Sequence, residues 1–185
     1  MSTSSSGLII RDGLETDIES CLALDADYET TQVWQMTFQP ETSGRGVVFR
    51  TERLPREMPV VYPLSEYRLR LALAHGLCFL VAETRDEPEM LGYLLMQADP
   101  IQRSAVIQDI VVSRPLRRHG IGTRLYNVAR RWALERDLVQ LMGVTQTKNY
   151  PAIAFFQKQG MGFCGYNDQY FRSGDIAVFF GQPLR

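Results

Sequence analysis

The alternation of apolar and polar positions along the chain predicts a mixed order of strands and helices. Apolar runs rich in β-branched residues and bounded by turn residues predict strands over 8–10, 78–83, 90–96, 105–112, 139–145, 163–170 and 176–180. Apolar residues at helical spacing predict helices over 14–25, 64–75, 120–136 and 151–158. Gly76 and Gly160 follow two of these helices and suit their C-terminal caps.

The order of these elements predicts an α/β fold. The strands at 78–83, 90–96 and 105–112 are joined by short polar turns, which predicts an antiparallel meander. The long helix at 120–136 separates the third of them from the strand at 139–145, and a crossover of this length predicts a parallel pair. We therefore expect a mixed, mostly antiparallel central sheet with flanking helices.

A further hairpin is predicted before the meander. Residues 31–38 and 47–49 have strand character around a turn cluster at 40–44. Trp34 and Tyr28 either line a substrate pocket or cover this hairpin. Prolines 55, 59 and 63 predict a linker across the surface. Without an internal repeat or a long linker, residues 7–185 are expected to form a single domain behind a disordered, serine-rich N-terminus at 1–6.

Composition excludes several classes of function and partner. A net charge of -1 gives no general attraction to nucleic acid or membrane. No apolar run approaches the roughly 18 residues of a membrane span, and no signal peptide is evident, so a cytoplasmic protein is expected. The three scattered cysteines predict buried thiols in a reducing compartment. His75 and His119 are too few and too far apart in sequence for a zinc site, so no metal is expected.

Candidate chemistry concentrates in residues 107–122. A β-branched strand, a turn and the start of a helix follow one another, and this order builds a site for an anion. Glycines at 120 and 122 allow a tight turn, and Arg117 and Arg118 add positive charge. A Walker loop would need Gly-Lys-Ser/Thr, and a dinucleotide fingerprint would need a third glycine, so neither pattern is complete.

Two motifs resemble those of the GNAT N-acetyltransferases. The first is Arg117-x-x-Gly120-x-Gly122 after a strand, which is similar to the acyl-CoA pyrophosphate loop of that family. The second is the family segment Asn-x-x-Ala-x-x-aromatic-aromatic-x-Lys-x-Gly-Phe, found here over 149–163. Its register is kept by Asn149, Ala152, Phe156, Lys158 and Gly160. The matched region runs from about 105 to 163.

The resemblance implies acetyl-CoA as cosubstrate, and a small-molecule amine is the expected acceptor. From the net charge, the apolar runs and the histidines, no nucleic-acid, membrane or metal partner is expected. Some family members pair through their last strands, so a homodimer is one expectation. The resemblance assigns backbone groups of the strand to the pantetheine arm and the turn to the pyrophosphate. The cofactor-binding residues it implies are Ile110, Val111, Val112, Arg117, Arg118, His119, Gly120, Ile121, Gly122, Asn149, Phe156 and Lys158.

The usual catalytic groups of the family are missing from their positions. Phe156 stands where members often have a tyrosine that protonates the leaving thiolate, and Val144 stands where several have a glutamate. Asp109 is the replacement base that we expect, acting through water, and Tyr170 is the replacement acid. The alternatives are a salt bridge or strand-end cap for Asp109 and a packing role for Tyr170.

Residues 105–112 and the tail at 166–180 are also similar to streptothricin-type acetyltransferases, which acetylate a cationic antibiotic. Gln108 replaces the glutamate that precedes the aspartate in that group. Three alternatives stay open besides a small-molecule N-acetyltransferase. They are a weakly active or inactive acyl-CoA-binding module, a protein N-acetyltransferase, and a Rossmann-type nucleotide binder.

Overall fold

The computed structural model describes residues 7–41, 44–86 and 88–184, so the expected disordered segment at 1–6 and part of the turn at 40–44 lie outside the described residues. The chain divides into two compact units. The first contains the chain up to residue 27, residues 61–143 and the last residues from 181. The second contains residues 28–60 and 144–180.

The first unit is built on a mixed sheet. Its strands are β1 (Leu8–Asp12), β4 (Cys78–Thr84), β5 (Met90–Asp99), β6 (Ser104–Val112) and the start of β7 (Gln140–Gln146), in the order β1-β4-β5-β6-β7. Neighbouring strands are antiparallel except β6 and β7, which are parallel. The predicted meander, the parallel crossover and the mixed, mostly antiparallel sheet are therefore confirmed.

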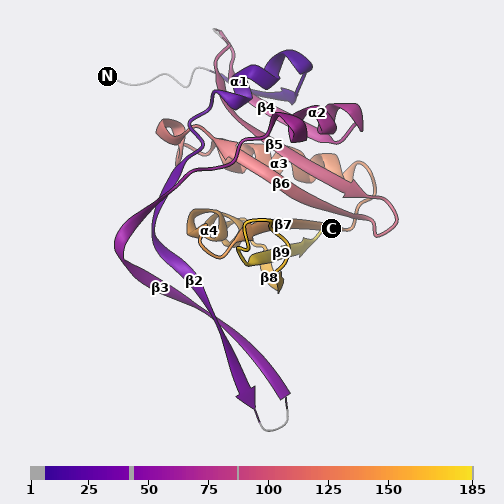
Figure 1. Ribbon diagram of the computed structural model, residues 1–185. Helices are drawn as coiled ribbons and strands as arrows, with labels where there is room; N and C mark the ends of the chain where they lie inside the picture. The colour runs from indigo at the N-terminus through magenta and orange to yellow at the C-terminus, as the bar shows by residue number, and fades with distance from the viewer. Residues whose placement is uncertain (1–6, 42–43, 87, 185) are drawn as a thin grey trace. The chain divides into compact units, whose positions relative to one another are not determined.

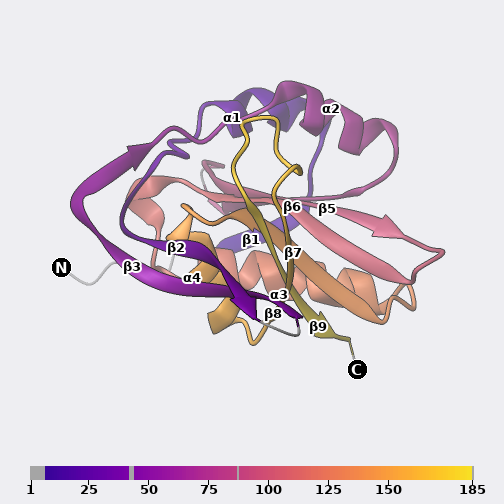
Figure 2. The same ribbon diagram turned by 60° about the horizontal axis from the view of Figure 1, so that its bottom comes forward.

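Helices cover both faces of these strands. On one face lie η1 (Glu15–Asp17), α1 (Ile18–Leu22) and α2 (Glu66–Ala74), and on the other lies α3 (Ile121–Leu134) (Figure 1). Figure 2 shows the same layers from another side, with α1 and α2 above the strands and α3 below them. A short turn, η2 (Arg114–Leu116), connects β6 to the segment before α3.

Apolar side chains pack on each face of the sheet. Between the sheet and the two shorter helices, Cys21, Leu69 and Val81 are completely buried. On α3, Leu125 and Ala129 are buried as the helical spacing predicts, whereas Trp132 is only half-buried. The guanidinium carbon of Arg136 lies 3.8 Å from the centre of the Trp132 ring, so this tryptophan supports a cation–π contact at the helix end.

An ion-pair network links β1, the edge strand of the sheet, to its neighbours in the first unit. Arg11 of β1 lies 2.7 Å from Asp17 and 2.8 Å from Glu83 of β4. The two carboxylates stabilise the protonated guanidinium and raise its pKa further. Arg11 therefore joins the first strand, the turn before α1 and the adjacent strand.

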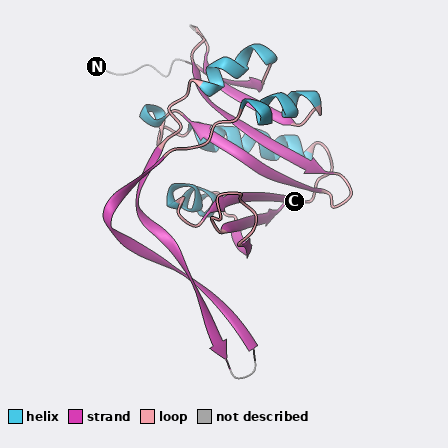
Figure 3. Cartoon of the chain, viewed as in Figure 1, coloured by secondary structure: helices cyan, strands magenta, loops and turns pink. Residues whose placement is uncertain are grey.

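The second unit contains a hairpin much longer than predicted. Strands β2 (Tyr28–Glu41) and β3 (Gly44–Val60) form an antiparallel two-stranded sheet, drawn as two long arrows in Figure 3. The linker predicted at Pro55 and Pro59 is wrong, because both prolines lie inside β3. Pairing jumps from Thr30–Met58 to Gln32–Arg53, so Pro55 falls in a bulge. A residue without an N–H is tolerated at a bulge or on an unpaired strand edge.

Aromatic packing holds the second unit together. This unit also contains α4 (Tyr150–Lys158), β8 (Gly162–Asn167) and most of β9 (Ala177–Pro183), which lies between β7 and β8. The Trp34 ring centre is 5.8 Å from Phe49 of the hairpin, 5.7 Å from Phe163 and 5.6 Å from Phe180. Trp34 therefore covers the hairpin, as one of the two predicted alternatives states.

The cysteines follow the prediction only in part. Cys21 and Cys78 are buried, and burial raises the pKa of each thiol to about 12. Cys164 is exposed on β8, so the prediction of three buried thiols is wrong at this position. The expectation depended on apolar neighbours in the sequence, but successive side chains of a strand point to opposite faces.

Candidate active site

The turn between β6 and α3 has the backbone that the glycine pattern predicts. Gly120 directly precedes α3 with a φ of 84°, and Arg118 also has a positive φ of 69°. No side chain caps the start of α3, because the residue at the capping position is this glycine. Amide groups of the first helical turn point out of the helix end and attract negative charge. The local structure therefore suits an anion at residues 117–122.

The arginines of this turn differ in their surroundings. Arg118 and His119 are exposed, while Ile121 is buried against the core of the unit. The Arg117 guanidinium instead donates to the carbonyl oxygens of Val112 at 2.9 Å, Asp27 at 2.8 Å and Ala26 at 2.9 Å. Desolvation lowers its pKa, although a guanidinium stays charged. Arg117 thus holds protein backbone, a role that the motif does not reveal.

Strand β6 has two different edges near its end. On one edge, pairing with β5 continues through Val112 opposite Gly92. On the other, the parallel register with β7 ends at Ile107 opposite Gly143. In the described part of the chain, residues 108–112 therefore have no ladder partner on that edge. Arg117 occupies the Val112 carbonyl, and the other main-chain groups on this edge suit an extended ligand, as the resemblance implies for residues 110–112.

Asp109 lies on this part of β6 and is almost completely buried, with a side chain 1% exposed. The Tyr62 hydroxyl donates a hydrogen bond to Asp109 Oδ1, and Nη1 of Arg68 lies 3.2 Å from the same oxygen. Burial raises the pKa of Asp109, while Arg68 and the Tyr62 hydrogen bond oppose this rise. The same burial, with the charge of Asp109, raises the pKa of Tyr62.

This arrangement gives Asp109 the salt bridge that was its predicted alternative role, and it also leaves a carboxylate with raised proton affinity. A carboxylate whose pKa rises toward neutrality becomes a better base. Because the side chain is closed off, a proton would have to pass through a hydrogen-bonded neighbour to reach it. The Tyr62 hydroxyl already occupies such a position.

The second unit holds the residues of the downstream motif. Asn149 directly precedes α4, and its Oδ1 accepts a hydrogen bond from the Ala152 amide at 3.1 Å, so it caps the helix. Phe156 is 2% exposed and its ring stacks on Phe180 at 5.8 Å, which makes it part of the aromatic core. Lys158 is exposed at the other end of α4.

The candidate acid Tyr170 is 42% exposed. Its ring meets Phe171 and Phe179 edge-on, at 5.1 Å and 5.3 Å. These contacts pack the ring against two aromatic neighbours, and the residue remains partly open to solvent. Val144, at the family's glutamate position, is buried and carries no polar atom.

Sequence reasoning missed Tyr62, Arg68 and Asp27 as parts of this region. Asp27 Oδ1 accepts a hydrogen bond from the Tyr62 amide at 2.9 Å, and Tyr62 and Arg68 both contact Asp109. These residues are separated from their partners by between 35 and 47 positions. No local spacing links residues so distant in sequence. A buried aspartate in an apolar strand does signal that donors must come from elsewhere.

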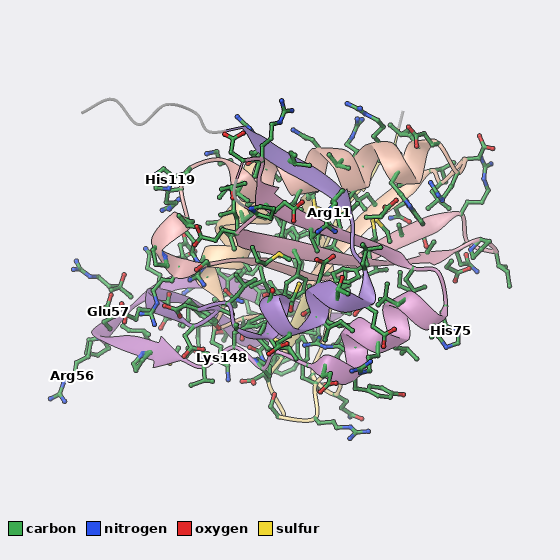
Figure 4. All side chains as sticks on the ribbon, turned by 90° about the horizontal axis from the view of Figure 1, so that it is seen from above. Arg11, Arg56, Glu57, His75, His119 and Lys148 are labelled. Atoms are coloured by element: carbon green, nitrogen blue, oxygen red, sulfur yellow. The ribbon has the colours of Figure 1, made fainter. Side chains whose placement is uncertain are left out.

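Within the described residues, no group of three or more histidine, cysteine, aspartate or glutamate side chains is arranged to hold a metal ion. His75 and His119 lie far apart in Figure 4. Among the helices of the described chain, none combines the length and apolarity that crossing a bilayer requires.

Comparison with known protein families shows which family the chain belongs to. Residues 47–163 match the acetyltransferase (GNAT) family. The chain belongs to this family. It is therefore an acetyltransferase of the N-acyltransferase class. The match includes the turn after β6 and the segment around α4, which carry the two motifs. The sequence finds no match among curated proteins.

Solved structures confirm the GNAT fold. A nourseothricin acetyltransferase is 23% identical with a TM-score of 0.83, covering 96% of this chain and 99% of that one. A Bacillus anthracis protein assigned as a streptothricin acetyltransferase, solved with acetyl coenzyme A, is 18% identical with a TM-score of 0.75 and covers 98% and 100%. The Escherichia coli ribosomal-protein-S18-alanine N-acetyltransferase is 15% identical with a TM-score of 0.66 and covers 96% and 94%.

Proposed function

We propose that this GNAT protein transfers an acetyl group from acetyl-CoA to a primary amine of a small molecule. The single observation that carries the proposal is the end of β6 with the turn that follows it. One strand edge lacks a ladder partner from residue 108 in the described chain, and the turn ends in an uncapped helix. Extended main-chain groups and an anion site in succession suit a pantetheine arm that ends in a pyrophosphate.

The residues present fit this cosubstrate. Main-chain groups of 110–112, apart from the Val112 carbonyl that Arg117 holds, would bind the pantetheine. The amides of the turn at 117–122, with the exposed side chains of Arg118 and His119, would hold the pyrophosphate. Asn149 and Lys158 are assigned to the cofactor only by the family motif, and Phe156 would support the site as a packing residue. When bound, acetyl-CoA supplies the activated acetyl group.

Side chains of the protein would carry out two proton transfers, one from the amine and one to the departing thiolate. A primary amine is mostly protonated at neutral pH, so a base must remove a proton before the nitrogen can attack. Asp109 is the proposed acceptor of that proton, through the Tyr62 hydroxyl or a water molecule. Tyr170 is the proposed donor to the departing thiolate. A thiol has a pKa of about 8.5, so the donor contributes less than the base.

The acceptor is proposed to be a small amine rather than a protein N-terminus. The similarity of residues 105–112 and 166–180 to streptothricin-type acetyltransferases supports this choice, and the fold likeness to the nourseothricin enzyme agrees with it. A second candidate is an acyl-CoA-binding module with little activity. The apolar Phe156 and Val144 at the usual catalytic positions favour this alternative.

A thermal-shift and turnover experiment tests the proposal. Acetyl-CoA and CoA are expected to raise the melting temperature, and NAD is not. An amine panel that includes streptothricin, a polyamine and an N-terminal peptide, followed by free-thiol release, then identifies the acceptor class. Stabilisation without thiol release would favour the binding module, and peptide turnover alone would favour a protein acetyltransferase. Tyr170→Phe should lower turnover at an unchanged affinity for acetyl-CoA, with Tyr166→Phe as the control.

A further inference from the structure

The guanidinium of Arg117 donates hydrogen bonds to main-chain carbonyl oxygens of the protein itself. Its Nε donates to Val112 and its Nη1 to Asp27, while Nη2 reaches the carbonyls of Ala26 at 2.9 Å and Asp25 at 3.3 Å. A guanidinium has five N–H donors in a fixed planar fork. Four contacts with carbonyls therefore occupy most of its capacity and fix its orientation.

The segment 25–27 that Arg117 binds is also fixed from a second side. The Arg114 amide donates to the Asp25 carbonyl at 2.8 Å, and its guanidinium lies 3.1 Å from the Asp25 carboxylate. This segment follows α1 and precedes the hairpin, so it contains no regular backbone pairing of its own. Its carbonyls accept hydrogen bonds from the Arg117 side chain, and the Asp25 carbonyl also accepts one from the Arg114 amide.

The segment in turn holds Tyr62. Asp27 Oδ1 accepts the Tyr62 amide hydrogen at 2.9 Å, and the Tyr62 hydroxyl donates to Asp109. A continuous series of hydrogen bonds therefore runs from Arg117, beside the turn at 117–122, through Asp27 and Tyr62 to Asp109. All of these residues lie in the first unit.

We propose that Arg117 is a positioning residue, which ties the segment 25–27 to the turn and through Asp27 sets Tyr62 against Asp109, and that it is not a phosphate ligand. Turning the guanidinium toward a phosphate would remove the Arg117 donors from the carbonyls of Ala26, Asp27 and Val112, while the Asp25 carbonyl would keep the Arg114 amide. Its charge is also partly withdrawn from solvent, unlike that of Arg118. The consequence for Asp109 depends on the proposed function, whereas the hydrogen-bond series does not.

Residue-resolved hydrogen exchange tests the series directly. In Arg117→Gln, the amides of Tyr62 and Arg114 should exchange at least about tenfold faster, while the β4 amides keep their protection, because local opening changes only the amides it exposes. The control is Arg56→Gln, since Arg56 is exposed on β3 and projects into solvent in Figure 4. An unchanged Tyr62 amide, or equal loss of protection across β4, would overturn the proposal.

Binding measurements with CoA and pantetheine distinguish a positioning role of Arg117 from a phosphate-binding role. Arg117→Gln should change the dissociation constant for CoA less than about threefold, because no phosphate contact is lost. The substitution should change the dissociation constant for pantetheine by a similar factor. Selective loss of CoA binding with normal pantetheine binding would contradict the proposal. Arg117→Lys should resemble Arg117→Gln in exchange, since a single ammonium cannot replace the fork; restored protection by lysine would also contradict it. If wild type binds no CoA, the proposed function fails, while the exchange result still decides the role of Arg117.

Discussion

Tyr62 donates its hydroxyl hydrogen to Oδ1 of Asp109, an aspartate buried in the strand that leads to the proposed cofactor turn. Arg68 approaches the same oxygen at 3.2 Å. Burial removes water from the Asp109 carboxylate and so costs free energy when the group is charged. The two donors offset part of this cost. The raised pKa of Asp109 is the measurable consequence of that cost.

Asp109→Asn should slow acetyl transfer without weakening acetyl-CoA binding. The amide keeps the size of the carboxylate but cannot take a proton, and general-base assistance is worth about two to four powers of ten in rate. Steady-state rates at saturating acetyl-CoA, together with calorimetric binding, measure the two effects separately. A variant with the wild-type rate would remove Asp109 from the mechanism.

The same substitution should raise stability at neutral pH. The folded pKa of Asp109 lies above its ordinary value, so the folded state binds an extra proton between the two pKa values and wild-type stability rises as pH falls through this window. The neutral amide of the variant would carry no such penalty. The melting temperature of Asp109→Asn should therefore exceed that of wild type near pH 7.5, and the difference should shrink at acid pH. A difference that is constant with pH would contradict this account.

Tyr62→Phe should move the acid limb of the pH–rate profile to higher pH. The Tyr62 hydrogen bond lowers the pKa of Asp109, so its loss lets the pKa rise further. The variant should also lose about 1–3 kcal/mol of stability at neutral pH, because the buried carboxylate loses one of its two donors and keeps only Arg68. Tyr67→Phe is a suitable control because Tyr67 is 73% exposed. A shift toward lower pH would show that the hydroxyl acts in another way.

Gly92→Ala should destabilise the junction of β5 and β6. A Cβ added at Gly92 would overlap the Val111 carbonyl oxygen and lie 3.2 Å from the Val112 Cα, and main chain cannot move aside as a flexible side chain can. Overpacking of this kind costs about 1–3 kcal/mol. Gly165→Ala is the matched control, because a Cβ added there would have no heavy atom of another residue within 4 Å. Chemical denaturation of both variants gives the comparison, and equal midpoints would contradict the predicted clash.

Sequence patterns predicted the parts of the fold that depend on local periodicity. The spacing of Leu125 and Ala129 predicted the buried face of α3, and the three apolar runs predicted the antiparallel meander. The long hairpin was not predictable in this way. Pro55 and Pro59 suggested a break, but a two-stranded sheet with a bulge accepts prolines in β3.

In the candidate site, too, local features could be predicted from the sequence and long-range contacts could not. Glycine at 120 predicted a turn with positive φ, and the structure has it. The partners of Asp109 and the carbonyls bound by Arg117 were beyond prediction, since Tyr62 is 47 positions from Asp109 and Asp27 is 90 from Arg117. Contacts over such separations follow from the packing of whole elements. A basic residue beside a glycine turn indicates positive charge, but not which oxygen atoms it meets.

The most direct measurement is a calorimetric titration of acetyl-CoA into wild type, Gly120→Glu and Gly76→Glu. Gly120 precedes α3 and Gly76 follows α2, both have a positive φ, and a Cβ added at either would meet nothing within 4 Å, so the two substitutions impose similar backbone strain. Only the substitution at Gly120 would place a carboxylate at the proposed pyrophosphate site. We predict that wild type and Gly76→Glu bind acetyl-CoA and that Gly120→Glu does not. Equal binding by all three proteins would contradict the proposal that this turn holds the cofactor.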